Sequence, residues 1–170
     1  KVFASNDEFK LSFRAPSAKV MVVDDNKVNL QVASELMKKF GFEPVLVESG
    51  SEAINRIEEN LVTYDIVFMD HMMPFMDGVE ATQKIRAIQT EYAQELPIVA
   101  LTANAIKGVE RQFKEAGMND YISKPIHMKQ LSDILEKWIP IAKQVRIMDG
   151  KEIAAPRSYF TNPMLKKEAE

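Results

Sequence analysis

The sequence predicts an α/β protein built on a doubly wound parallel sheet, in which five strands alternate with five helices in the strand order 2-1-3-4-5. Short apolar runs without polar alternation recur along the chain, as in strands that are buried on both faces. Segments with apolar residues at helical spacing lie between these runs. Charged or hydroxyl side chains follow the runs directly, at the edge where such sheets bind ligands.

The first half of the predicted domain, which we expect to span residues 19–139, contains three strands and two helices. The expected strands are Val20–Val23, Pro44–Val47 and Ile66–Asp70. The first helix follows Asn26 and stops near Gly41, since glycine is typical of helix ends. Its expected inward positions are Val28, Val32, Leu36 and Phe40. Ser49 and Glu52 have the spacing of a capping box at the start of the second helix. The residues expected on one face of that helix are Ala53, Ile54, Ile57 and Leu61.

The second half is expected to contain two more strands, Pro97–Leu101 and Tyr121–Ser123, and three helices. Asp77 and Glu80 form a second capping box, and Gly117 and Pro140 mark helix ends. The inward positions expected in these three helices are Ala81, Ile85 and Ile88, then Ile106, Val109, Phe113 and Ala116, then Leu131, Ile134, Leu135 and Trp138. This alternation predicts right-handed crossovers between parallel strands.

The two flanks lack this regular pattern. We interpret residues 1–18 as a linker or the end of an upstream domain, because Glu8–Arg14 alternates like a strand and Ala15-Pro16-Ser17 then breaks it. We interpret residues 140–170 as a linker or C-terminal tail, because the helical periodicity is lost there.

Composition limits the classes of protein that the chain can belong to. The sequence has 46% hydrophobic residues, 28% charged residues and a net charge of −3, as in a globular domain without a basic field for nucleic acid. The absence of cysteine excludes disulfides and thiolate metal sites. No apolar stretch approaches the roughly 18 residues of a membrane span.

Polar side chains gather where the predicted strands end. Asp24 and Asp25 follow the first strand, Asp70 ends the third, Thr102 follows the fourth and Lys124 follows the fifth. The chain reverses direction between the first and third strands, so their carboxylates should converge in the crevice at that point. Three carboxylates so close resist ionising together, and a hard divalent cation that takes oxygen ligands, best Mg²⁺, removes that penalty.

This arrangement predicts phosphoryl transfer onto Asp70. A carboxylate whose charge is balanced by a metal can attack phosphorus in line and form an acyl phosphate. Lys124 and Thr102 can stabilise the oxygens of the transferring group, and the ammonium of Lys124 favours the deprotonated form of Asp70. We therefore expect these three residues to carry the chemistry.

Four motifs in register resemble the receiver domain of two-component response regulators, with its flavodoxin-like fold, over residues 19–139. They are Val-Val-Asp24-Asp25-Asn, Phe-Met-Asp70-His-Met-Met-Pro-Phe-Met-Asp-Gly, Ala-Leu-Thr102-Ala-Asn-Ala and Tyr121-Ile-Ser-Lys124-Pro125. The second and third motifs are most similar to those of receivers in hybrid sensor histidine kinases. Residues 7–16 resemble the closing strand of a kinase ATP-binding domain, which suits that placement.

The resemblance implies a role for each residue of the site. Asp70 would be the phosphoacceptor, Thr102 and Tyr121 would be a switch pair, and Lys124-Pro125 would be a cis peptide. The residues implied to surround Mg²⁺ are Asp25 and Asp70, the backbone carbonyl of Met72, and Asp24 through a water molecule.

The resemblance also implies a phosphorelay module rather than a turnover enzyme. Its expected partner is a histidine kinase or a histidine phosphotransfer domain, with a homodimer left open and neither nucleic acid nor membrane contacted directly. The expected location is the cytoplasm, on the cytosolic side of the membrane for a sensor kinase.

Several alternatives remain open at this point. The domain could be a stand-alone response regulator, or a receiver-shaped scaffold that binds partners without phosphorylation. A phosphohydrolase that works through an aspartyl phosphate is disfavoured, because such enzymes carry a second Asp where Met72 stands. A flavin carrier is disfavoured, because Asp24 and Asp25 would repel its phosphate. Taken singly, Asp24-Asp25-Asn26 could cap a helix, and Tyr121 could be a strand-edge aromatic.

Overall fold

The computed structural model describes residues 9–105 and 107–153 of the 170-residue chain. Its central sheet has five parallel strands in the spatial order β3-β2-β4-β5-β6, which is the predicted order 2-1-3-4-5 counted along the domain. The strands are β2 (Val20–Val23), β3 (Val45–Val47), β4 (Ile66–Asp70), β5 (Ile98–Thr102) and β6 (Asp120–Ser123). The predicted fold class is therefore confirmed.

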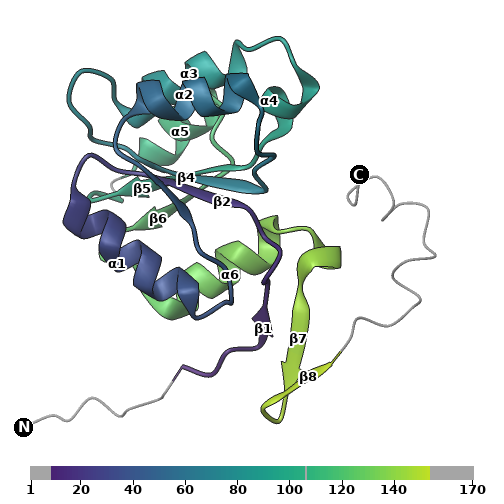
Figure 1. The fold of residues 1–170 in the computed structure, drawn as a ribbon. Coiled ribbons are helices and arrows are strands. Elements are labelled where there is room, and N and C mark those ends of the chain that lie inside the picture. The colour runs from purple at the N-terminus through teal and green to yellow at the C-terminus, as the bar shows by residue number, and fades with distance from the viewer. Residues whose placement is uncertain (1–8, 106, 154–170) are drawn as a thin grey trace, which may run out of the picture.

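Helices cover both faces of this sheet (Figure 1). The helices are α1 (Lys27–Lys38), α2 (Gly50–Glu59), α3 (Gly78–Arg86), α4 (Glu91–Glu95), α5 (Val109–Ala116) and α6 (Met128–Trp138). α1 and α6 pack on one face, while α2, α3 and α5 pack on the other. Val20 and Val22 of β2 belong to the first core and Met21 and Val23 to the second, because successive strand residues point to opposite faces. The short helix α4 was not predicted.

The predicted helix starts are confirmed by their caps. The hydroxyl of Ser49 accepts a hydrogen bond from the backbone N–H of Glu52 at 3.1 Å, and Asp77 Oδ1 accepts one from the N–H of Glu80 at 2.8 Å. These bonds satisfy amide groups that have no partner within the first turn of a helix. Gly117, with φ of +99°, ends α5 as predicted.

The predicted inward positions of the first helix are confirmed for Phe40, which is fully buried, and for Leu36, which packs partly buried against the core. The other two are wrong. Val28 is 70% exposed and Val32 is 50% exposed. The buried residues of α1 are Leu30, Ala33, Ser34 and Met37. Two apolar stripes share the helical spacing in α1, and only packing against the sheet decides which one is buried. Leu61 of the second predicted helix is also exposed, because α2 ends at Glu59.

A second, three-stranded antiparallel sheet joins the two flanks in the order β1-β7-β8. Its strands are β1 (Phe13–Arg14), β7 (Val145–Met148) and β8 (Lys151–Ile153), and a short 3-10 helix (Ile141–Lys143) precedes β7. Of the strand expected over Glu8–Arg14, only Phe13–Arg14 is a strand among the described residues. Glu8, Ile106 and the tail beyond residue 153 lie outside the described residues. The domain boundaries at residues 19 and 139 stay a prediction.

The hairpin of β7 and β8 was missed within the segment interpreted as linker or tail. Asp149 and Gly150 form its turn with φ of +51° and +73°, and an Asp-Gly pair is a strong hairpin signal. In the part of the chain that the structure covers, no helix combines the length and apolarity that a bilayer crossing demands.

Candidate functional site

The site lies at the carboxyl ends of the central strands, where the apolar runs give way to polar residues. Asp24 follows β2 and is 1% exposed, and Asp70 is the last residue of β4 and is 5% exposed. Asp25 is exposed to solvent. Strands buried on both faces carry their first polar side chains only at their ends, which places these carboxylates at one edge of the sheet.

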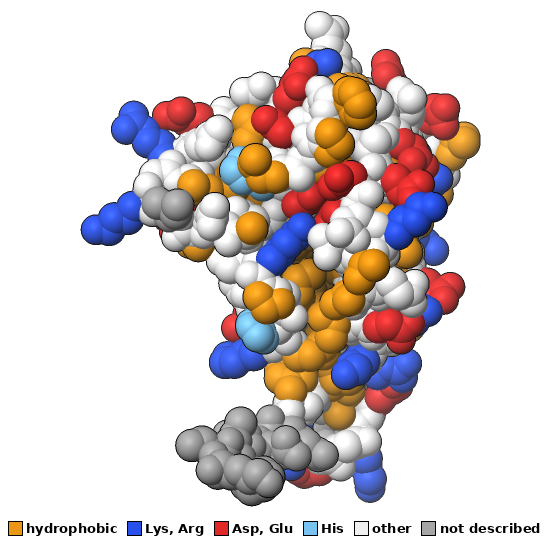
Figure 2. Space-filling view, turned by 90° about the vertical axis from the view of Figure 1, so that its left-hand side faces the viewer, with side chains coloured by type: hydrophobic (Ala, Val, Ile, Leu, Met, Phe, Trp, Pro, Cys, Tyr) orange, Lys and Arg blue, Asp and Glu red, His pale blue; other side chains and the backbone are white. Residues whose placement is uncertain are grey.

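The structure brings the three carboxylates together. One oxygen atom from each of Asp24, Asp25 and Asp70 lies within 4.8 Å of the others. Figure 2 shows acidic side chains gathered in the middle of this face, with hydrophobic side chains around them. A set of ligands made only of carboxylate oxygens fits a hard cation such as Mg²⁺ and suits softer transition metals poorly.

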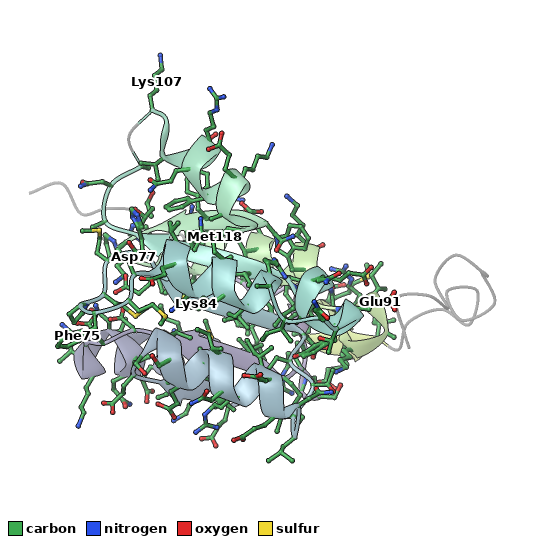
Figure 3. The ribbon with its side chains drawn as sticks, turned by 90° about the horizontal axis from the view of Figure 1, so that it is seen from above. Phe75, Asp77, Lys84, Glu91, Lys107 and Met118 are labelled. Carbon is green, nitrogen blue, oxygen red and sulfur yellow. The ribbon has the colours of Figure 1, made fainter. Side chains whose placement is uncertain are left out.

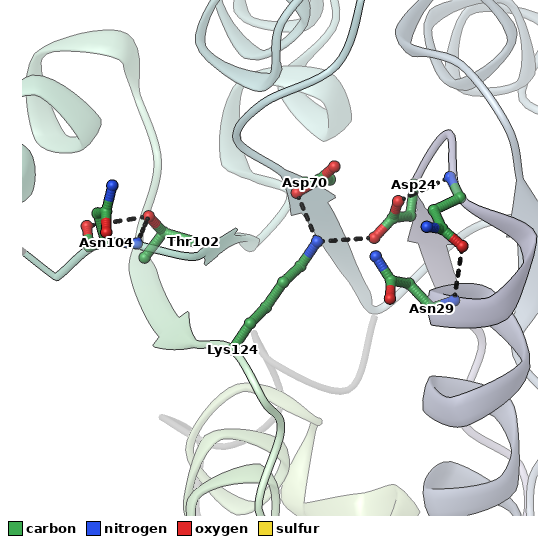
Figure 4. A network of polar contacts seen from close by, with 7 residues as sticks. Asp24, Asn29, Asp70, Thr102, Asn104 and Lys124 are labelled. Carbon is green, nitrogen blue, oxygen red and sulfur yellow. Dashed lines mark hydrogen bonds and ion pairs between the residues drawn. The ribbon is translucent and has the colours of Figure 1, made fainter.

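Lys124 lies between two of these carboxylates (Figure 4). Its Nζ donates hydrogen bonds to Asp70 Oδ1 at 2.8 Å and to Asp24 Oδ2 at 2.9 Å. The backbone N–H of Asn26 donates to the other oxygen of Asp24 at 2.9 Å, so both oxygens of Asp24 are engaged. The Lys124-Pro125 peptide is cis, as the resemblance implied.

The direction in which the pKa of Asp70 is shifted differs from the prediction. Burial raises the pKa of Asp70 above its ordinary value, and the nearby charge of Asp24 raises it further, although the hydrogen bond from Lys124 opposes this. The expectation that Lys124 holds Asp70 deprotonated is therefore incomplete, because burial outweighs it. Burial alone would lower the pKa of Lys124, but its bonds to Asp70 and Asp24 raise that pKa overall.

Glycine is required where α3 approaches β4. A Cβ atom added at Gly78 would lie 2.2 Å from the carbonyl oxygen of Asp70, far inside contact distance. The N–H of Gly78 donates to the carbonyl of His71 at 3.0 Å, which closes the loop after the strand. Asp77-Gly78 of the second motif thus allows the start of α3 to pack directly against the end of β4.

Thr102 and Tyr121 share one face of the sheet. Tyr121 pairs with Ala100, which lies two residues before Thr102 on β5, so all three side chains point the same way. Thr102 is buried, and its hydroxyl donates to the carbonyl of Asn104 at 3.1 Å (Figure 4). The hydroxyl of Tyr121 donates to the carboxylate of Glu110 on α5. In this conformation, therefore, both hydroxyl groups bond to other residues than Asp70.

Two residues of the loop after β4 are open to solvent. Met72 is 71% exposed, and its carbonyl as a metal ligand stays a prediction. Phe75 is fully exposed and has a φ of +66°, which is rare for an aromatic residue. Figure 3 shows Phe75 and Lys107 on the outside of the molecule, at two separate loops.

Sequence reasoning missed Glu110 as the partner of Tyr121. The two residues lie eleven positions apart, on α5 and β6, and the contact depends on how that helix packs against that strand. No local pattern in the sequence signals it. Asn104 lies two residues after Thr102 within the third motif, but the hydrogen bonds between its backbone and that hydroxyl were not predicted.

Curated relatives of the chain are much longer than the chain itself. It is 44% identical over 133 residues to the sensor protein GacS of Pseudomonas syringae pv. syringae, which covers 78% of this chain and 14% of that protein. It is 36% identical over 124 residues to the hybrid signal transduction histidine kinase I of Dictyostelium discoideum, covering 71% of this chain and 7% of that protein. The chain therefore spans only a small part of these relatives.

Solved receiver domains share the fold. The receiver domain of a sensor histidine kinase from Pseudomonas aeruginosa PAO1, with a magnesium ion in its active site cleft, is 38% identical with a TM-score of 0.63, covering 71% of this chain and 96% of that chain. The receiver domain of the histidine kinase CKI1 from Arabidopsis thaliana, complexed with Mg²⁺ and BeF₃⁻, is 31% identical with a TM-score of 0.64, covering 72% and 90%.

A sequence family accounts for most of the chain. Residues 20–136 match the family described as the response regulator receiver domain. This range contains all the strands of the central sheet and the residues at their carboxyl ends. The resemblance noted in the sequence motifs is thereby confirmed, and the chain belongs to the response regulator receiver domain family.

Proposed function

We propose that this receiver takes a phosphoryl group from a phosphohistidine onto Asp70 and passes between two conformations as a result. One observation carries the proposal: three carboxylates lie within 4.8 Å of one another, and Lys124 hydrogen-bonds two of them. A buried carboxylate that is surrounded by like charge and by one ammonium suits a nucleophile whose charge must be balanced before it reacts.

Asp25 and Asp70, with the carbonyl of Met72, would hold Mg²⁺. Asp24 would contact the ion through water, in agreement with the engagement of both its oxygens by Lys124 and Asn26. When bound, the ion would neutralise the clustered carboxylates and polarise an oxygen of the phosphoryl group. The magnesium ions in similar receiver structures support this assignment.

The transfer step follows from the groups present. An oxygen of Asp70 attacks phosphorus, the bond from phosphorus to the histidine nitrogen breaks, and the imidazole departs with the electron pair. Lys124, released from its bond to Asp70 Oδ1, can follow the transferring oxygens with its positive charge. Thr102 can turn its hydroxyl from the carbonyl of Asn104 to a phosphoryl oxygen.

The same turn of Thr102 would drive the conformational switch. When the hydroxyl of Thr102 turns, it leaves space on the face of the sheet where Tyr121 also lies, so the ring of Tyr121 can move inward. The ring must first give up its hydrogen bond to Glu110 on α5. Phosphorylation would thus change the conformation of the surface around α5 and β6.

The phosphodonor is proposed to be a histidine kinase or a histidine phosphotransfer domain in the cytoplasm. Exposed apolar residues follow the acidic residues along the chain: Val28 and Val32 on α1, after Asp25, and Met72 and Phe75 on the loop after β4. Exposed apolar groups around a charged centre suit a protein that docks and then reacts. The similarity to hybrid kinases supports a place in such a protein rather than in a stand-alone regulator.

Intact-mass spectrometry tests the chemistry. The chain is incubated with Mg²⁺ and acetyl phosphate, and a mass gain of one phosphoryl group is expected. Asp70→Asn should abolish the gain, and so should EDTA, whereas Asp133→Asn, which removes an exposed carboxylate on α6, should leave it unchanged. A gain that persists in Asp70→Asn, or no gain in any sample, would overturn the proposal.

A further inference from the structure

We infer that the two segments flanking the receiver form a brace, made of β1 with β7 and β8, which belongs to the folded unit and holds the points of chain entry and exit side by side. The brace lies outside residues 20–136, the range that the family accounts for. Figure 1 shows its three strands together, outside the central sheet. The inference does not depend on phosphorylation.

The N-terminal part of the brace is built into the core. Phe13 and Ala15 are both fully buried and belong to the core cluster that contains Phe40, which follows α1. The rings of Phe13 and Phe40 lie 5.3 Å apart between centroids, and the N–H of Ala15 donates to the carbonyl of Phe40 at 2.8 Å. A segment that acted only as a flexible tether would not bury an aromatic ring completely.

The C-terminal part is fastened by polar contacts. Gln144 is 4% exposed, and its side-chain amide donates to the carbonyls of Glu136 and Ile139 at the end of α6. Lys143 forms an ion pair of 2.8 Å with Asp65, which precedes β4. Buried polar groups are retained where every hydrogen bond is satisfied, so this segment has a defined place on the receiver.

The register of the small sheet fixes how close the two ends lie. Phe13 and Ile153 both pair with Arg146, one from each side of β7. Two strand spacings separate them, which is about 10 Å. An ion pair of 2.7 Å between Arg14 and Glu152 crosses β7 and joins the outer strands directly.

The brace lies at the end of the sheet opposite the phosphoacceptor. It meets the receiver where β2 and β4 begin, near Lys19 and Asp65, whereas Asp70 ends β4. The chain segments on either side of the receiver are therefore held next to each other, and the acidic cluster faces away from both. The brace thus lies away from the acidic cluster and leaves that end of the sheet open.

Spin labels test the pairing in the full chain. The sequence has no cysteine, so Lys10→Cys and Lys151→Cys, both exposed positions, can be labelled specifically. Lys10 lies three residues before β1 and Lys151 begins β8, so the two labels should lie within about 20 Å of each other and show strong dipolar broadening. Broadening absent from the doubly labelled chain would overturn the inference, and Asp70→Asn should leave it unchanged.

Urea unfolding tests whether the brace is part of the folded unit. Phe13→Ala should raise the equilibrium constant for unfolding at least about 100-fold, in a single transition, because it empties a filled core position. Phe9→Ala, which truncates an exposed ring four residues earlier, should change it less than about threefold. Equal effects of the two variants, or a separate transition for the brace, would contradict the inference. The rate of phosphorylation per folded molecule should not change in Phe13→Ala.

Discussion

The ammonium of Lys124 sets the charge balance around the reactive carboxylate. It lies 2.8 Å from Asp70 and 2.9 Å from Asp24, and it is the group that opposes the effect of burial on the pKa of Asp70. Without it, two buried carboxylates would face each other without compensation, a costly arrangement. Lys124 therefore acts on the pKa of Asp70, and in the proposed reaction it would also stabilise the phosphoryl oxygens.

Lys124→Ala should slow phosphorylation by acetyl phosphate about 100-fold, the usual effect of removing a group that stabilises a transition-state anion. The initial rate of the mass gain at saturating Mg²⁺ measures this. Lys129→Ala, which removes an exposed lysine of α6, is the matched control and should keep the full rate. An unchanged rate in Lys124→Ala would show that the ammonium is not needed.

Tyr92, which is not part of the acidic site, allows a separate test of how burial shifts the pKa of a side chain. Its hydroxyl accepts a hydrogen bond from the N–H of Tyr64 at 2.7 Å and donates one to the carbonyl of Tyr64. Burial raises the pKa of Tyr92 to about 12, so the folded state holds this proton more tightly than the unfolded chain. The resulting stability is complete below the unfolded pKa near 10 and is lost as pH rises toward 12.

Tyr92→Phe should therefore lose about 1–3 kcal/mol of unfolding free energy at pH 7, because the N–H of Tyr64 is left without a partner. Urea unfolding from pH 7 to pH 12 should show the wild type approaching the variant as pH rises above 10. A constant difference across that range would contradict the raised pKa.

The residues of the site were predictable because each one lies at the end of a predicted strand. A polar residue at the end of a doubly buried strand has no other place than the edge of the sheet, which predicted Asp24, Asp70 and Thr102. Lys124 follows β6, which is only partly buried, and was predicted from its place after the fifth expected strand. Glu110 was not predictable, because its partner Tyr121 belongs to another element. The direction of the pKa shift of Asp70 also needed the structure, since it depends on how deeply the carboxylate is buried.

At the scale of elements, α5 and β6 are the part of the receiver that we propose reports phosphorylation. The hydrogen bond from Tyr121 to Glu110 joins these two elements, and the ring centroids of Phe113 on α5 and Tyr121 on β6 lie 6.3 Å apart. The hydrogen bond to Glu110 is the main cause that raises the pKa of Tyr121, because the carboxylate accepts from the neutral phenol and repels its anion. This contact favours the outward position of the ring.

Glu110→Ala should free the ring and lower the pKa of Tyr121 toward its ordinary value. Nuclear magnetic resonance of ring-labelled tyrosine follows that titration. The rate of phosphorylation should rise about two- to fivefold, as expected when one exposed hydrogen bond no longer opposes the switch. Glu115→Ala, on the same helix, should change neither quantity, and an unchanged Tyr121 pKa in Glu110→Ala would contradict the role of this contact.

The elements differ in how well the sequence predicted them. Helix starts followed from local caps, and strands followed from apolar runs bounded by turns. The buried face of α1 did not, because Val28 and Val32 repeat with the same period as the residues that are in fact buried. The hairpin around Asp149-Gly150 carried a local turn signal, but its strands are short and partly exposed, so no apolar pattern drew attention to them.

At the scale of the molecule, different features lie at the two ends of the central sheet. The brace occupies the end where β2 and β4 begin, and the acidic cluster occupies the other end. We propose that a phosphodonor protein that docks at that end also covers Val32, an exposed residue of α1. A small phosphodonor needs no such contact.

Val32→Asp should therefore weaken phosphotransfer from a phosphorylated histidine phosphotransfer domain at least about tenfold, the usual cost of burying an unpaired charge in an interface. It should leave phosphorylation by acetyl phosphate unchanged. Val62→Asp, which alters an exposed valine after α2, is the matched control. A parallel loss with both donors would place Val32 in the fold or the chemistry rather than in docking.

In the proposed reaction Asp70, among all the acidic residues, forms the acyl phosphate. Borohydride reduces an aspartyl phosphate to homoserine, so treatment of the phosphorylated chain and subsequent peptide sequencing in the mass spectrometer locate the modified residue. We expect homoserine at position 70 alone, and only when Mg²⁺ was present during phosphorylation. Homoserine at position 24 or 25, or an unmodified Asp70 in a chain that has gained a phosphoryl group, would contradict it.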